Sequence, residues 1–346
     1  MEKAMTAKKG YEIKNYNGVD VIKLICSFLV CMIHIPVFYS KTVELPLFEQ
    51  DACGWANFLI RQGICRIAVP FFFVATGFFF FRKTAERGVE SETVKKYCFR
   101  LFRLMGIWLF LLFVGPIHQF WYLFASIVAV VVLSVCIYKG VKFRYLIIAA
   151  CVLYAIGLLG DLYYGLLDPI RGVKAIDYAI KLYERLFLST RNGIFMGIIF
   201  VLIGALFAYK KIKMPMAVAI IGFVITMATH YVEVMLTSVA GLPKDYNMSL
   251  SLPIAVFFLF YIAINIRLAD RPIYKRLRAI GVLIFYMHFM FDWLVRFGFE
   301  MVLRFTKVDL LPYLFPTVLS AVVLTSVLIE WLSGKKRLAF LRYLYE

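Results

Sequence analysis

Charged residues are scarce in this 346-residue chain. Asp, Glu, Lys and Arg make up 17% of it, whereas hydrophobic residues make up 63%. A soluble globular domain has roughly a quarter charged residues and about half apolar ones. The shortage of charge therefore excludes an ordinary soluble domain, and the long apolar runs predict an all-α polytopic membrane protein.

The seven cysteines show neither a Cys-x-x-Cys pair nor another spacing typical of metal ligands. Most lie in apolar runs, so they are interpreted as buried thiols, and no metal site is expected. A cleavable signal sequence is also not expected, because residues 1–17 are polar and basic and the first apolar run is too long. Without an internal repeat or an appended soluble domain, residues 1–346 are expected to form one integral-membrane domain.

About ten apolar runs are long enough, or nearly so, to cross a bilayer as helices. They cover residues 19–39, 62–81, 101–117, 120–137, 143–164, 192–209, 215–236, 252–266, 280–302 and 311–332. The run at 252–266 is short. An even number of spans places both ends of the chain on the same side of the membrane.

The basic residues predict the orientation of these spans. The formal net charge is +18, which by itself suggests nucleic-acid binding. The segments between the spans lie alternately on the two sides of the membrane, however. Those on the side of the termini hold 26 Lys and Arg residues, and those on the other side hold 10. The positive-inside rule therefore predicts cytoplasmic tails at 1–17 and 333–346 in the cell membrane. Anionic lipids, and not nucleic acid, are the expected partners of this charge.

The first apolar run carries a polar seam. Lys23 and His34 are eleven residues apart, which returns to within about 20° on a helix, and Asp20 and Ser27 fall on the same stripe. Ionisable groups in a membrane helix are costly and usually face a cavity or a partner. The alternative is that Asp20 and Lys23 are interfacial end residues and that His34 points outward.

Several other spans place polar residues at the outer-leaflet depth of His34. These residues are Arg66, His118, Arg191, Asn192, His230, Glu233, Asp292 and Arg296. Such a convergence predicts a polar site near the outer face.

A second group of charges lies near the inner face. Arg100 and Arg103 are i, i+3 neighbours, and Lys23 lies at the inner end of the first span. Together they could hold a phosphorylated cofactor through charge-assisted hydrogen bonds. Contact with anionic lipid is the alternative, and for the adjacent Lys95 and Lys96 it is the preferred interpretation.

Five short motifs, in this order, resemble those of acyltransferase family 3, the ten-span membrane O-acyltransferases that modify sugars and cell-envelope polymers. They are Asp20-x-x-Lys23 followed by His34; Arg66-x-x-x-Pro70-Phe-Phe-Phe ending in Thr76-Gly77-Phe78; Arg100 with Arg103; Trp121-Tyr122-Leu123; and Tyr286-Met287-His288. Two positions depart from the usual pattern, because Lys23 replaces an Arg and Thr76 replaces a Ser. A lysine keeps the charge but loses the planar fork of a guanidinium.

A further stretch, Thr190-Arg191-Asn192-Gly193 before a helix that contains Gly204, resembles a subgroup of this family. That subgroup includes the membrane domains of vancomycin-resistance serine racemases. The soluble racemase domain of those proteins has no counterpart here, so the resemblance does not imply racemisation.

The resemblance implies transfer of a short acyl group, commonly acetyl, from cytoplasmic acyl-CoA to a hydroxyl of an envelope glycan or lipid-linked sugar. Lys23, Arg100 and Arg103 would then bind the donor. His34 is the candidate base or acyl relay, with Glu233 as its orienting group or an alternate base. Arg66 is a candidate for stabilising the oxyanion, or for a structural ion pair.

A mid-span His288 is expected to be a structural core residue. Two alternatives to the enzyme remain. One is a transporter or flippase for a small amino acid or glycolipid, which buried charges would also suit. The sequence shows no paired broken helices and no evident inverted repeat to favour it. The other is a catalytically silent membrane partner.

Overall fold

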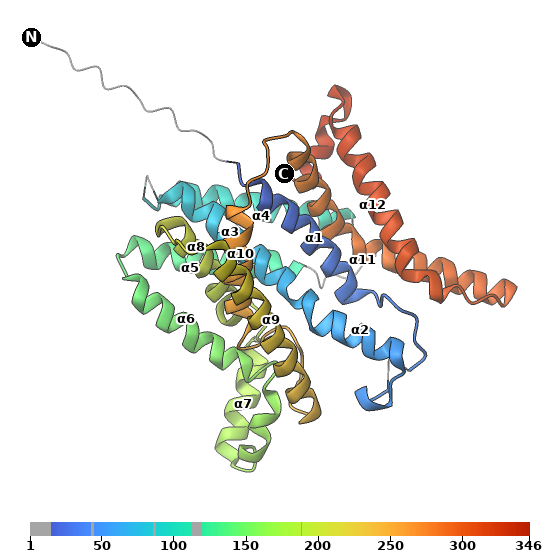
Figure 1. Cartoon of the computed structure of the whole chain (residues 1–346), viewed down its shortest axis with the longest axis horizontal. Helices are drawn as coiled ribbons and strands as arrows, with labels where there is room; N and C mark the ends of the chain where they lie inside the picture. Colours follow the sequence, from blue (N-terminus) through green and yellow to red (C-terminus); the bar gives the residue numbers. More distant parts are fainter. Residues whose placement is uncertain (1–14, 43–44, 86–87, 112–119, 188) are drawn as a thin grey trace, which may run out of the picture.

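The computed structural model describes residues 15–42, 45–85, 88–111, 120–187 and 189–346 (Figure 1). Most of the expected N-terminal tail, the end of the third expected span and His118 lie outside this part of the chain. The elements are, in order, α1 (Asn17–His34), η1 (Leu47–Glu49), α2 (Ala52–Gln62), η2 (Ile64–Ile67), α3 (Ala68–Thr84), α4 (Ser91–Leu111), α5 (Trp121–Tyr138), α6 (Phe143–Leu158), η4 (Tyr164–Ile170), α7 (Lys174–Phe187), η5 (Gly193–Gly197), α8 (Ile198–Tyr209), α9 (Met216–Val239), α10 (Leu252–Asn265), α11 (Ile273–Thr306), η6 (Leu311–Tyr313), α12 (Leu314–Ser333) and η7 (Lys336–Leu344).

Each of the ten expected spans overlaps at least one α-helix, in the expected order. The described residues are 79% helical and form no strand. Six segments are long and apolar enough to cross a membrane, and three shorter apolar helices accompany them. The prediction of an all-α polytopic membrane protein is confirmed.

The second span is preceded by a helix that the sequence analysis did not predict, since the expected span begins only at residue 62. Asp51 caps α2 by accepting a hydrogen bond from the backbone N–H of Gly54 at 2.7 Å, and α2 ends at Gly63. A Cβ at Gly63 would lie 2.1 Å from the ring of Tyr231 on α9. The next amide, at Ile64, donates to the Tyr231 hydroxyl at 3.0 Å. This contact holds the start of η2 against α9, and thereby positions Arg66, which lies in η2.

Two glycines let α3 and α8 cross at close range in the centre of the bundle. A Cβ at Gly77 would lie 2.1 Å from the carbonyl oxygen of Val201, and one at Gly204 would lie 2.1 Å from that of Val74. Small residues at a crossing allow two membrane helices to approach and gain packing energy. Any larger side chain at either position would force the helices apart.

The polar seam of α1 faces α11 for part of its length. Asp20 is 1% exposed and accepts two hydrogen bonds from the Arg278 guanidinium, at 2.8 and 2.7 Å. The Ser27 hydroxyl lies 2.8 Å from the carbonyl oxygen of Gly281. Lys23 instead packs over the ring of Phe79 at 4.7 Å. Asp20 is therefore a buried helix-to-helix contact and not an interfacial end residue.

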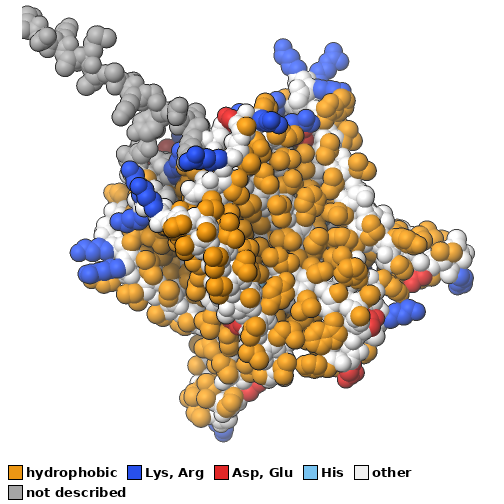
Figure 2. All heavy atoms as spheres, viewed as in Figure 1, with side chains coloured by type: hydrophobic (Ala, Val, Ile, Leu, Met, Phe, Trp, Pro, Cys, Tyr) orange, Lys and Arg blue, Asp and Glu red, His pale blue; other side chains and the backbone are white. Residues whose placement is uncertain are grey.

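The segments expected on the same side of the membrane contact one another. Asn15 donates to Asp270 in the loop between α10 and α11 at 2.7 Å, and Arg276 pairs with Glu330 near the end of α12 at 2.8 Å. Hydrophobic side chains cover the middle of the molecule, and many Lys and Arg side chains gather towards its upper rim (Figure 2). These contacts join segments that the prediction places on one side of the membrane, and which face is cytoplasmic stays a prediction.

Candidate functional site

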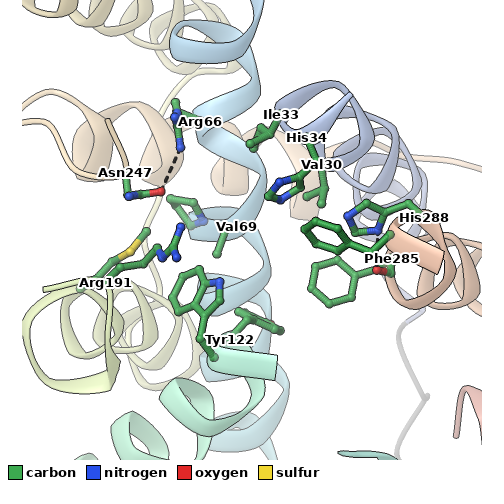
Figure 3. Close-up of a pocket in the computed structure, with 14 residues that line it drawn as sticks. Val30, Ile33, His34, Arg66, Val69, Tyr122, Arg191, Asn247, Phe285 and His288 are labelled. Carbon is green, nitrogen blue, oxygen red and sulfur yellow. Dashed lines mark hydrogen bonds between the residues drawn. The ribbon is translucent and has the colours of Figure 1, made fainter. Parts of the chain in front are cut away.

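A cavity opens where the C-terminal end of α1, the N-terminal ends of α3 and α5 and the middle of α11 meet the segments before η5 and α10. It leaves about 80 Å³ for the centres of water-sized molecules, enough for a small polar ligand or several waters. Its lining consists of Val30, Ile33, His34, Arg66, Val69, Pro70, Trp121, Tyr122, Arg191, Met196, Asn247, Phe285, His288 and Phe289. Figure 3 shows two histidines on one side and two arginines with Asn247 on the other.

His34 is the last residue of α1, and its side chain is exposed. Its ring stacks on that of His288, with centroids 5.4 Å apart and planes 29° from parallel. Phe289 packs on it as well, at 4.3 Å. Neither ring nitrogen of His34 has a hydrogen-bond partner within the described residues, so both are available to a ligand.

His288 is fully buried, as expected for a core histidine, but it also lines the cavity. Its Nδ1 lies 2.7 Å from the carbonyl oxygen of Phe285. A carbonyl can only accept, so Nδ1 carries the proton and Nε2 of the neutral ring carries the lone pair. Nε2 is buried without a partner in the described structure. The backbone of α11 thus fixes the tautomer that leaves a basic nitrogen unpaired.

Arg66 reaches the cavity from η2. Its Nε donates to Oε1 of Gln62 at 2.9 Å, a second N–H contacts the same oxygen, and Nη1 donates to Oδ1 of Asn247 at 2.9 Å. Both partners are neutral amides. Among the described residues no carboxylate contacts Arg66 directly, so the structural ion pair considered as an alternative is not formed. Three of its five N–H groups are used, which leaves two for a ligand.

Asn247 is held by a buried acid that sequence analysis did not single out. Asp161, in the loop after α6, accepts from Nδ2 of Asn247 at 3.2 Å and from the backbone N–H of Met248 at 3.0 Å. Burial, together with the charge of Asp245, raises the pKa of Asp161 to about 6. A carboxylate beside a basic loop carries no periodic signal, so only the fold reveals this contact.

Arg191 lies on the same side of the cavity as Arg66 and Asn247, opposite the two histidines (Figure 3). Its guanidinium packs over the indole ring of Trp121 at 5.0 Å. The backbone is fixed there because Asn192 accepts from the amides of Ile194 and Phe195 at 2.9 and 3.0 Å. A Cβ at Gly193 would lie 2.6 Å from the carbonyl oxygen of Ala125. These contacts give a structural reason for the Arg-Asn-Gly sequence.

Glu233 does not reach the cavity. Its carboxylate accepts from the Tyr163 hydroxyl at 2.9 Å and from the amides of Leu250 and Ser251, with a further bond from the Ser251 hydroxyl at 2.6 Å. These bonds anchor the start of α10. The structure therefore does not bring Glu233 to His34 as an orienting group, because the carboxylate is engaged elsewhere.

His230 cannot serve as a base in place of His34, because both of its ring nitrogens are already hydrogen-bonded. Its Nε2 lies 3.0 Å from the carbonyl oxygen of Gln62 and its Nδ1 lies 2.8 Å from the Ser249 hydroxyl. The carbonyl requires a proton on Nε2, so Nδ1 accepts from Ser249. With both nitrogens bonded inside the protein, His230 is a structural residue that joins α9 to the end of α2 and to the segment before α10.

The candidate donor residues do not line this cavity: Lys23 lies in the first half of α1, and Arg100 and Arg103 lie in the middle of α4. Arg100 and Arg103 line one surface groove on α4 together with Lys95 and Lys96. Arg103 packs over Tyr343 of the C-terminal segment at 5.1 Å. Lys23 does not line this groove, and its positive charge is repelled by that of Arg100. The structure therefore brings the two arginines together and leaves Lys23 beside them.

Comparison with known proteins agrees with these features. Residues 16–116 match the acyltransferase 3 family, described as an acyltransferase domain. An amino-acid racemase from Enterococcus faecalis is 30% identical over 212 residues, which are 55% of this chain and 28% of that protein. A serine/alanine racemase from Enterococcus gallinarum is 26% identical over 270 residues, 70% of this chain and 36% of that protein. The chain thus spans about a third of the length of these relatives.

No solved structure matches the chain. The matched region holds α1, α3 and the two arginines of α4, and so includes His34, Arg66 and the candidate donor groove. The racemase relatives agree with the subgroup indicated by the stretch around Arg191. The chain is therefore a multi-pass membrane protein whose residues 16–116 match the acyltransferase 3 family.

Proposed function

We propose that this protein transfers a short acyl group, in the first instance acetyl, from cytoplasmic acyl-CoA to a hydroxyl of an envelope glycan or lipid-linked sugar in the cell membrane. The observation that carries the proposal is the cavity in which an unbonded His34 stacks on His288 opposite Arg66. A hydroxyl nucleophile needs a positioned base, and the oxyanion that forms needs a positioned donor.

In the proposed reaction His34 removes the proton from the acceptor hydroxyl. The hydroxyl oxygen attacks the thioester carbonyl, the C–S bond breaks, and the proton passes from His34 to the sulfur of coenzyme A. The two unbonded N–H groups of Arg66 stabilise the oxyanion of the tetrahedral intermediate. Arg66 is suited to this role because Gln62 and Asn247 hold it in place without cancelling its charge.

His288 supports an acyl-relay variant of the same reaction. If His34 itself takes the acyl group as an acyl-imidazole, a second base must deprotonate the acceptor hydroxyl. The lone pair on Nε2 of His288, fixed by the bond from Nδ1 to Phe285, is adjacent to His34. An acyl-His34 adduct trapped by rapid acid quench and identified by mass spectrometry would distinguish the relay from direct transfer.

The donor is proposed to bind with its phosphates at Lys23, Arg100 and Arg103. Lys23 and His34 share a face of α1, and eleven residues of helix separate them by about 16 Å. An extended thioester arm can span such a distance. The phosphates of the donor can therefore stay at the cytoplasmic face while its acyl group reaches the cavity.

Mass spectrometry of envelope polymers tests the proposal. A strain that lacks the protein should lose an acyl modification that returns when the protein is restored. The transporter alternative predicts changed uptake of a small amino acid or glycolipid with no acylated product in either strain. Absence of any acyl difference under conditions in which the protein is expressed would contradict the enzyme.

A further inference from the structure

Arg191 has no role in the reaction proposed above, yet it is one of only two charged residues that line the described cavity. No side-chain hydrogen bond connects its guanidinium to a described residue; its recorded contact is the Trp121 ring at 5.0 Å. A partly buried cation without a counter-ion is costly next to a membrane interior. Such a cost is commonly retained where a ligand supplies the missing charge.

The charges around the cavity favour an anion. Arg66 and Arg191 both line it, and its described lining contains no Asp or Glu. Asp161 is separated from Arg66 by the amide of Asn247 and bonds to Asn247 and Met248. The positive charge of Arg191 therefore faces the cavity without a carboxylate in contact.

The backbone around Arg191 is held in place by the two residues that follow it. Asn192 caps the following turn, and Gly193 packs against the backbone of α5. Its contact with the Trp121 ring leaves the N–H groups of the guanidinium unbonded within the described residues. A guanidinium with free N–H groups suits bidentate recognition of a carboxylate or phosphate. Figure 3 places this group across the cavity from His34 and His288.

From these contacts we infer that Arg191 binds an anionic group, a carboxylate or a phosphate, on the molecule whose hydroxyl faces His34. This inference rests on the proposed function for the identity of that molecule as the acyl acceptor. The anion site itself does not depend on catalysis. The acceptor is thus a hydroxy acid or a hydroxyl-bearing phosphate, and a neutral polyol is excluded.

Binding can be measured without any acyl donor. The purified protein in detergent is titrated with sodium lactate, glycerol 3-phosphate and glycerol at constant ionic strength, with tryptophan fluorescence as the readout, since Trp121 contacts Arg191. One of the two anions should bind and glycerol should not. Binding of lactate would identify the recognised group as a carboxylate, and binding of glycerol 3-phosphate would identify it as a phosphate. Arg191→Gln should weaken that binding by about ten- to a hundredfold, and Arg191→Lys by less.

Arg296→Gln is the matched control, because Arg296 on α11 already pairs with Asp292 at 2.9 Å and does not line the cavity. It should leave anion binding unchanged. Equal responses to glycerol and to both anions, or an unchanged affinity in Arg191→Gln, would overturn the inference. Acyl transfer to a neutral acceptor would overturn the anion site at Arg191 and leave the proposed function intact. Anion binding without any acyl transfer would support the anion site and contradict the proposed function.

Discussion

Arg66 and Asp161 do not touch, yet a single amide joins them. Asn247 accepts from Arg66 through its oxygen at 2.9 Å and donates to Asp161 through its nitrogen at 3.2 Å. The buried carboxylate thereby fixes which way the amide points, and the amide fixes the arginine at the cavity. Asp161 is a positioning residue in this arrangement, since it acts on the site only through Asn247.

The raised pKa of Asp161 makes stability depend on pH. Its pKa rises from 3.8 to about 6 on folding, so the folded state binds the proton more tightly than the unfolded state. The resulting stabilisation is present below pH 3.8 and is lost as pH rises through about 6, by at most about 3 kcal/mol for a shift of this size. The melting temperature in detergent should therefore fall over this range.

Asp161→Asn should remove that pH dependence. It should also destabilise the protein at neutral pH, since the new amide would present a donor to the Asn247 donor. Asp177→Asn, which breaks the exposed ion pair of Asp177 with Lys181, is the control and should keep the wild-type slope. An unchanged slope in Asp161→Asn would show that another group controls the pH dependence.

The donor groove predicts a selective kinetic effect. Replacing both Arg100 and Arg103 by Ala should raise the acyl-CoA concentration needed for half-maximal rate by about ten- to a hundredfold, since each loses a charge-assisted contact. Initial rates at varied acyl-CoA measure it, with melting temperature as the check on folding. The matched double variant at Lys95 and Lys96 should change little, because these exposed residues are assigned to lipid. Equal effects of the two double variants would assign the whole groove to lipid.

The orientation of the bundle predicts which loops are reachable from outside. Cysteines introduced at Lys174, at the start of α7, and at Lys211, between α8 and α9, both replace exposed side chains. In a background without the native reactive thiols, an impermeant maleimide added to intact cells should label position 174 and spare position 211. Labelling only at 211 would invert the topology and place the histidine cavity on the cytoplasmic side.

The sequence predicted the helices well because a bilayer demands long apolar segments, and each expected run became a helix. Periodicity also placed Lys23 and His34 on one face of α1, and depth placed Arg66 near His34. Helix α2 was absent from the prediction, because the expected second span begins only at residue 62. The amphipathic helix α7 was likewise absent from the prediction, since it does not span.

Side-chain partners were less predictable. Glu233 and His34 lie at similar depths, but depth does not specify direction around the bundle, and Glu233 turns to the start of α10. The roles of Asp161 and Asn247 depend on a loop-to-loop contact between residues far apart in the sequence. The free Nε2 of His288 depends on a backbone bond within α11. Such contacts become visible only once the helices are packed.

The most direct test of the account is acyl transfer by His34→Ala. Proteoliposomes containing the wild-type or variant protein are supplied with acyl-labelled acetyl-CoA and an envelope fraction, and labelled acceptor is quantified alongside melting temperature. The exposed ring of His34 leaves no large apolar void, so its removal should spare stability while reducing transfer by about 10²- to 10⁴-fold. His230→Ala, which breaks two internal hydrogen bonds, should instead lower stability. Full transfer by His34→Ala at wild-type stability would contradict the central assignment.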